Sequence, residues 1–298
     1  MPTSNLRGIL AMLAAVATFA VMDVTMKRLV ETYPAMQVTF LRGAASLPFL
    51  LCATGLFGRW KDLLPRRWGL HLVRGLLTVA TLWLFVSAVE RLSLADTYAI
   101  FMSAPLLVTS LSVPMLGERV GWRRWVAVLA GLAGVLIVLK PSGAGWVTLG
   151  GLAALASASG YALGAITIRI LARTDTNASI VLWSLLLLTA ISGALAAGGW
   201  VAVRPEHWPW IAALGLSGAV GQYLLTEAFS RASPPVVAPL EYSALVWGML
   251  FDWLIWLTVP GVRMLLGASI IIGSGLYVIH RERLRGVAAM EVKELAAS

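Results

Sequence analysis

Charged side chains are scarce in this sequence of 298 residues. Asp, Glu, Lys and Arg together make up 12% of it, whereas hydrophobic residues make up 59%. Soluble domains use about one quarter charged residues, because their surfaces contact water. A protein surrounded by lipid needs no such surface and can be as apolar outside as inside. The composition therefore excludes an ordinary soluble domain and predicts a membrane protein.

Cysteine and histidine are also scarce, which limits the chemistry that the chain can perform. The single cysteine, Cys52, excludes an intramolecular disulfide framework, and we interpret it as a small packed hydrophobic residue. The three histidines, His71, His207 and His280, lie near predicted helix ends, which disfavours a histidine metal centre or a Ser-His-Asp triad. A phosphate-binding GxxxxGK(S/T) loop is absent. We therefore expect no metal, no cofactor and no enzyme.

The formal net charge of +9 does not indicate a nucleic-acid partner. The basic residues form short clusters between apolar runs, as in 59–67 and 281–285, and no basic domain is present. The first apolar run reaches Lys27 and Arg28 without a small-residue cleavage pattern, so we expect a retained helix and not a cleaved signal peptide.

Long apolar runs predict an all-α membrane protein with ten transmembrane helices, since a span needs about 20 residues. The expected spans are 8–29, 36–56, 70–89, 95–116, 122–140, 147–170, 178–199, 209–229, 236–257 and 260–280. An even number of spans places both termini on one side. The segments on that side hold sixteen Lys and Arg residues against six on the other, which predicts that both termini are cytoplasmic.

The second half of the sequence resembles the first. Residues 88–138 align with 228–278 at a constant offset of 140, including Arg91 with Arg231, and an offset of 142 aligns the starts of the two halves. Each copy would hold five spans, and an odd number gives the two copies opposite orientations. Such inverted repeats are typical of secondary transporters, although duplication can also simply build a stable bundle.

Three segments carry a family resemblance. Ala95 to Pro141 reads as an apolar span, the turn Gly117-Glu118-Arg119 and a glycine-rich span, and both Phe40-Leu41-Arg42 and Pro239 to Trp256 fit the same pattern. In these segments the chain resembles the EamA family of the drug/metabolite transporter superfamily. The second copy departs from the family pattern at Thr258, where a Gly-Glu pair is common, so we assign no site to that turn.

The resemblance implies two EamA repeats, 1–141 and 142–283, followed by a cytoplasmic tail, 284–298. It also implies a central cavity between the repeats, a small-molecule substrate and no ATP-binding domain. Within the superfamily the chain is similar to amino-acid and metabolite exporters of the YddG type, and also to riboflavin or S-adenosylmethionine carriers.

Ionisable residues inside spans are costly in hydrocarbon and therefore need a partner or a function. Asp23 and Lys27 are four residues apart, so they share a helical face and can neutralise each other. We predict ionic gates at the two ends of the bundle, although snorkelling or fixed pairing would satisfy the same residues. The candidate gate residues are Asp23, Lys27, Arg42, Asp96, Glu227 and Arg231.

Polar and aromatic residues near the middle of the spans are candidates for substrate binding. A cavity for an amphipathic metabolite needs flat apolar walls and a few hydrogen-bonding groups. The amide of Gln222 needs a partner in hydrocarbon, whereas any single Tyr or Trp can equally be a packing residue. The candidates are Trp83, Tyr98, Ser103, Tyr161, Gln222, Tyr223, Glu241 and Tyr242.

The sequence thus predicts an alternating-access carrier of a small metabolite, an amino acid or a related amphipathic compound, exported across a bacterial cytoplasmic membrane. The first alternative is a riboflavin or S-adenosylmethionine uptake carrier. An intramembrane enzyme or a passive channel is the alternative of another class. The expected partners are the substrate and membrane lipid, with or without a coupling proton. Substrate identity, direction, coupling ion and oligomeric state stay open at this level.

Overall fold

The computed structural model describes residues 2–57, 60–89, 91, 97, 100–139, 148–256 and 261–295. Every regular element among these residues is a helix, which confirms the all-α prediction. The first half contains α1 (Pro2–Val30), α2 (Ala35–Phe57), η1 (Trp60–Leu63), α3 (Trp68–Val89), α5 (Ala104–Leu116) and α6 (Trp122–Leu139). The second half contains α7 (Leu149–Leu171), α8 (Asn177–Ala196), η2 (Ala197–Gly199), η3 (Pro205–His207), α9 (Trp208–Arg231), α10 (Pro234–Val237), η4 (Ala238–Tyr242), α11 (Ser243–Trp256) and α12 (Val262–Leu295).

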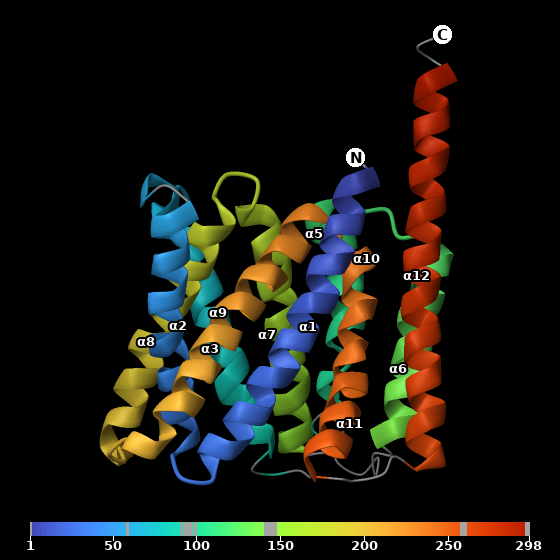
Figure 1. The fold of residues 1–298 in the computed structure, drawn as a ribbon. Coiled ribbons are helices and arrows are strands. Elements are labelled where there is room, and N and C mark those ends of the chain that lie inside the picture. The colour runs from blue at the N-terminus through green and yellow to red at the C-terminus, as the bar shows by residue number, and fades with distance from the viewer. Residues whose placement is uncertain are drawn as a thin grey trace.

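The long helices run side by side as a bundle, with the start of α1 and the end of α12 at the same end (Figure 1). We call this end the termini face and the other end the opposite face. Among the described residues, five helices are long and apolar enough to cross a membrane, and α5 and part of α12 are shorter apolar helices. Cys52 is exposed on α2, so the prediction that it is a packed residue is wrong; an apolar exposed residue suits a helix surface in lipid.

The packing of the helices repeats between the two halves. Helix α1 packs against α9, and α3 packs against α7. The sequence offsets relate α1 to α7 and α3 to α9, so the same contact occurs twice with the halves exchanged. Helix α2 packs against its own counterpart α8, which places the approximate two-fold relation between these two helices. The bundle therefore contains two inverted repeats, as predicted.

Small residues allow the central helices to approach closely. A Cβ atom added at Gly215 of α9 would lie 2.5 Å from the carbonyl oxygen of Ala45 on α2 and 2.6 Å from its Cβ. The Ser46 hydroxyl donates a hydrogen bond of 2.9 Å to the Gly215 carbonyl at the same crossing. Close contact and interhelical hydrogen bonds hold helices together in lipid, where the hydrophobic effect between them is absent.

We expect Gly215→Val to destabilise the protein, because the new side chain would push the α2 and α9 backbones apart. Overpacking of this kind costs about 1–3 kcal/mol. The measurement is the apparent melting temperature in detergent. Gly273→Val on α12 is the matched control, since a Cβ there meets no atom within 4 Å. Equal melting temperatures for the two variants would contradict this account of the crossing.

The predicted span 236–257 is interrupted in the structure. It consists of α10, the 3-10 helix η4 and α11, and prolines occupy 234, 235 and 239. Proline has no backbone N–H and its ring clashes with a preceding carbonyl, which explains why a continuous α-helix does not form. At the end of α5, Gly117 adopts a left-handed φ of 69° and donates to the carbonyl of Val113, so the Gly-Glu turn is a helix stop.

Candidate functional site

A cavity of about 460 Å³ lies inside the bundle and is lined by residues from both halves. This volume falls within the range of about 300–1,000 Å³ that is typical of small-molecule sites. Helices α1, α2 and α3 contribute from the first half, and α7, α8 and α9 from the second. The polar lining residues are Asp23, Thr39, Arg42, Arg74, Thr78, Thr81, Tyr161, Ser184 and Gln222.

The cavity extends toward the opposite face. Met26, Val30 and Ala35, next to the turn between α1 and α2, belong to its lining at that end. Ile168 of α7 and Phe229 of α9, which approach the termini face, line its other end. The lining therefore runs from the opposite face past the middle of the bundle and ends at apolar side chains.

Polar contacts close the bundle beyond Ile168 and Phe229. The Arg169 guanidinium donates to the backbone carbonyl of Ser230, joining α7 to α9. The Asn177 amide on α8 donates to the Glu227 carboxylate and, over 3.1 Å, to the Ser230 hydroxyl. We call these four residues, Arg169, Asn177, Glu227 and Ser230, the α7–α9 seal.

The corresponding helices of the first half are arranged differently. Helices α1 and α3 are the repeat counterparts of α7 and α9, yet within the described residues they make no packing contact comparable to that of α7 with α9. The two repeats thus differ where the seal lies. This asymmetry leaves the cavity closed at the termini face and extended toward the opposite face.

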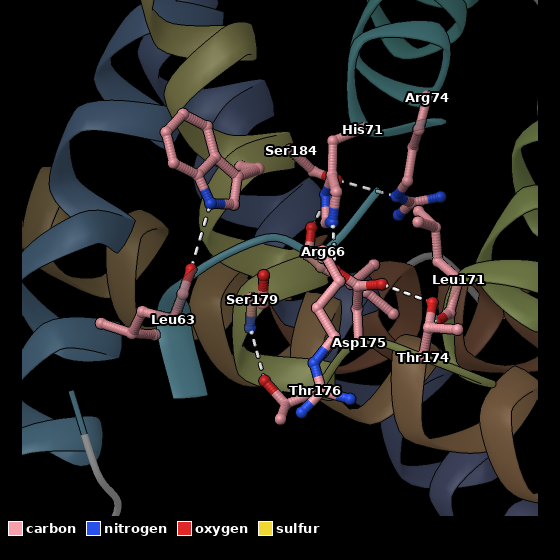
Figure 2. Close-up of polar contacts among 12 residues, drawn as sticks. Leu63, Arg66, His71, Arg74, Leu171, Thr174, Asp175, Thr176, Ser179 and Ser184 are labelled. Atoms are coloured by element: carbon pink, nitrogen blue, oxygen red, sulfur yellow. Dashed lines mark hydrogen bonds and ion pairs between the residues drawn. The ribbon is translucent and has the colours of Figure 1, made fainter. Parts of the chain in front are cut away.

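The turn between α7 and α8 is tied to the first half through Asp175. Its carboxylate accepts a hydrogen bond of 2.6 Å from the Arg66 backbone N–H, and it lies 3.1 Å from Nε2 of His71 (Figure 2). Thr174 donates to the other carboxylate oxygen over 2.6 Å. The His71 and Asp175 side chains are 1% and 0% exposed. This cluster holds the α7–α8 turn against the start of α3.

These hydrogen bonds keep the Asp175 carboxylate ionised although its side chain is buried. Burial acts to raise the pKa of the carboxyl, but the hydrogen bonds from Thr174, the Arg66 backbone and His71 outweigh burial, so the pKa lies below its ordinary value. A carboxylate that accepts several hydrogen bonds is stabilised in its charged form.

The opposite face carries the same arrangement with a different residue. Tyr33, in the turn between α1 and α2, aligns with Asp175 at the offset of 142. Its hydroxyl accepts a 3.0 Å hydrogen bond from the Arg204 backbone N–H and lies 2.7 Å from Nδ1 of His207. Each turn is therefore bound by an arginine backbone N–H and a histidine ring of the other half, although Arg204 and His207 do not align with Arg66 and His71 at the offset of 140.

Two of the predicted gate residues lie in the cavity lining. Asp23 is exposed although it is in the interior of α1, and its position in the cavity wall explains this exposure. Its charge acts on Arg42 of α2, whose guanidinium carbon lies 5.9 Å from the centre of the Phe19 ring. Among the described residues, Nε of Arg42 has no hydrogen-bond partner. The Lys27 side chain and Asp96 lie outside the described part of the structure.

The predicted pair Glu227 and Arg231 lies at the termini face. The two residues form an ion pair one helical turn apart on α9, and Glu227 also belongs to the α7–α9 seal. The structure thus separates the six candidate gate residues into a cavity group and a seal group.

The candidate substrate residues are divided in a similar way. Tyr161 and Gln222 line the cavity, and Glu241 lies beside Tyr161 outside the lining. Trp83 and Tyr223 are 58% and 42% exposed and lie outside the lining. Tyr242 is fully buried in a cluster with Val128, Val135 and Ile271, and Ser103 precedes α5 outside the lining. Tyr98 is outside the described residues.

Sequence reasoning missed Arg74, which it counted as a charge at the end of a span. The structure places Arg74 in the cavity wall with 5% exposure. Its Nε donates to the Ser184 hydroxyl over 2.8 Å, and its Nη1 donates to the Gly164 carbonyl over 3.0 Å. The signal was available, since an arginine inside a span needs partners wherever it lies.

The aromatic wall of the cavity was also not predicted as a unit. The rings of Phe85 and Phe101 meet edge to face with centres 5.2 Å apart, and Phe101 meets Tyr161 in the same way at 5.9 Å. All three residues line the cavity. Such a wall offers apolar surface to a flat ligand.

Comparison with known proteins gives consistent matches over the whole chain. The model of the EamA-like transporter family matches residues 6–140 and 148–280. A riboflavin transporter of Rhizobium johnstonii is 29% identical over 297 residues, covering 95% of this chain and 94% of the relative. A pseudopaline exporter of Pseudomonas aeruginosa is 28% identical over 268 residues, covering 89% and 93%.

An S-adenosylmethionine uptake transporter of Rickettsia bellii is 28% identical over 263 residues, which are 88% of this chain and 89% of the relative. One solved structure, titled "Crystal structure of protein", superposes with a TM-score of 0.79 at 20% sequence identity, covering 94% of this chain and 98% of the other. That likeness shows a shared fold.

Proposed function

The chain belongs to the EamA-like transporter family, and from this membership we propose that it carries an amphipathic metabolite, an amino acid or a related compound, by alternating access. It is a multi-pass membrane transporter of small metabolites and not an enzyme. The proposal adds that both termini are cytoplasmic and that transport runs outward across the bacterial cytoplasmic membrane.

The observation that carries the proposal is one cavity between two inverted repeats that differ in conformation. The α7–α9 seal closes the termini face, whereas its counterpart at α1 and α3 is unformed among the described residues. If the repeats exchanged conformations, the seal would open and a seal between α1 and α3 would form. The same cavity would then reach the other side of the membrane.

The repeat register supplies a residue for the second seal. Lys27 on α1 aligns with Arg169 on α7 at the offset of 142. A cation at the same position of each repeat can serve the two seals in turn. Lys27 therefore remains in the proposed gate together with Asp23 and Arg42, whereas Glu227 and Arg231 act at the termini face.

The lining favours a substrate with both apolar and charged parts. Phe85, Phe101 and Tyr161 supply the apolar wall, and Asp23 and Arg42 supply charge. A riboflavin uptake carrier is the second candidate, because two of the similar proteins are named riboflavin transporters at 29% identity. The wall would suit the flat flavin ring as well as an aromatic amino acid.

Counterflow in proteoliposomes tests the proposal. Vesicles preloaded with unlabelled tryptophan, riboflavin or S-adenosylmethionine are diluted into the labelled compound, and we expect saturable, transient accumulation of one class. Gln222→Ala should lower the apparent affinity several-fold, since an amide hydrogen bond contributes about 0.5–1.5 kcal/mol. Arg67→Gln, at an exposed arginine before α3, is the matched control.

Accumulation that does not saturate and shows no dependence on the internal compound would identify a channel and overturn the carrier proposal. Saturable counterflow of riboflavin alone would replace the amino-acid proposal with the second candidate.

A further inference from the structure

Arg74 is a buried cation whose hydrogen-bonded partners, among the described residues, are all neutral. The two hydrogen bonds from its guanidinium go to the Ser184 hydroxyl and the Gly164 carbonyl. In the described part of the chain, no carboxylate forms an ion pair with it. A buried charge without an opposite charge is costly in low-dielectric surroundings. A nearby anion would therefore stabilise the Arg74 guanidinium.

The position of Arg74 makes a ligand the natural source of that anion. The residue lines the cavity together with Thr78 and Thr81, which follow it at one-turn and two-turn spacing on α3. The Thr81 hydroxyl is buried and has no hydrogen-bond partner among the described residues. That hydroxyl faces Gly160 of α7, where an added Cβ would lie 2.5 Å from it, so the Arg74 guanidinium is the group on this helix that offers a charge to the cavity.

The charge balance of the lining indicates one missing negative charge. Within the described part of the chain, the charged lining residues are two arginines, Arg42 and Arg74, and one carboxylate, Asp23. Asp23 follows Phe19 by one turn on α1, and the Arg42 guanidinium lies 5.9 Å from the centre of the Phe19 ring, so Asp23 lies at the Arg42 end of the lining. Among the described residues Arg74 has no ion pair with a carboxylate. The Glu241 carboxyl lies beside Tyr161 and is not part of the lining. A ligand with a single negative charge would balance the lining, whereas a phosphate dianion would overcompensate it.

We propose that the transported metabolite carries a carboxylate and that Arg74 binds it. Arg74 forms the anion subsite, while the apolar body of the ligand lies on the wall of Phe85, Phe101 and Tyr161. This inference rests on the proposed function and narrows its substrate class. It separates carboxylates from neutral ring compounds such as riboflavin, which have no group for the subsite.

The test compares acids with their amides, which differ only in the proposed contact. Indole-3-acetate against indole-3-acetamide, and tryptophan against tryptophanamide, compete for counterflow in proteoliposomes of the full chain. For wild type we expect each acid to inhibit at a concentration at least about tenfold below that of its amide. Arg74→Gln should remove this preference, and Arg74→Lys should keep part of it because the charge remains.

Arg67→Gln is the control, since it removes an exposed arginine on the connection to the same helix and should keep the full preference. Melting temperatures of all variants show which of them are folded. If Arg74→Gln does not fold, Arg74→Lys provides the test. Equal inhibition by acid and amide in wild type overturns the inference, as does a preference that persists in a folded Arg74→Gln.

Counterflow without any acid preference leaves the proposed carrier intact and removes only the carboxylate subsite. Absence of counterflow for every compound overturns the carrier proposal and this inference with it.

Discussion

Asp175→Ala is expected to lower the free energy of unfolding by about 3–5 kcal/mol, because three donors lose their acceptor in a buried place. These donors are the Arg66 backbone N–H, the Thr174 hydroxyl and His71. The neighbouring carboxylate of Asp62 provides the matched control, since the Thr176 hydroxyl donates to the Asp62 backbone carbonyl and not to its side chain. Melting temperatures in detergent measure both variants. An Asp175→Ala protein as stable as Asp62→Ala would contradict the role of the cluster.

The contribution of Asp175 also has a defined pH dependence. Its pKa is lowered in the folded protein, so the unfolded chain binds the proton more readily than the native one. The stabilisation is complete above the unfolded pKa of about 3.9 and is lost as the pH falls through the lower folded value. The difference in stability between wild type and Asp175→Asn should therefore shrink as the pH falls below about 4.

The tyrosine at the corresponding turn should matter less. Tyr33 forms hydrogen bonds with the Arg204 backbone and His207 but contributes no carboxylate. The two turns share a position in the repeat, yet the turn at the termini face is bound through the Asp175 carboxylate and the other turn through the Tyr33 hydroxyl. This difference shows that the two faces have diverged in chemistry while keeping the repeat geometry.

The fold was predictable because span length and the repeat register are properties of the sequence itself. Apolar runs of the right length and an offset of 140 or 142 are sufficient to predict two inverted sets of helices. The interruption at Pro239 was visible as a proline but not as a 3-10 segment, since that depends on how the neighbouring helices pack.

The cavity residues were less predictable because a membrane helix is apolar on every side. In a soluble helix the polar face marks the surface, but lipid and protein interior both accept apolar residues, so the sequence gives the depth of a side chain and not its direction. Trp83 and Tyr161 both lie within spans, yet only Tyr161 reaches the cavity. Arg74 shows the reverse error, since it lies in the cavity wall but was not among the candidate residues.

Cross-linking the α7–α9 seal is expected to abolish transport. After Cys52→Ala removes the single native cysteine, Arg169→Cys and Ser230→Cys place thiols where α7 meets α9, and a reducible bifunctional thiol reagent about as long as an arginine side chain joins them. Alternating access requires these helices to separate, because their counterparts α1 and α3 are not in comparable contact among the described residues. Counterflow should therefore fall at least about tenfold and return when the cross-link is reduced.

The two single-cysteine variants, treated with the same reagent, show the effect of modification without a cross-link, and they should keep the flux that each has before treatment. This comparison isolates the separation of α7 from α9 as the step being tested. Undiminished counterflow through cross-linked protein would mean that the seal does not open during transport. The cavity would then have to reach the termini face by another route, and the exchange of conformations between the repeats would be refuted.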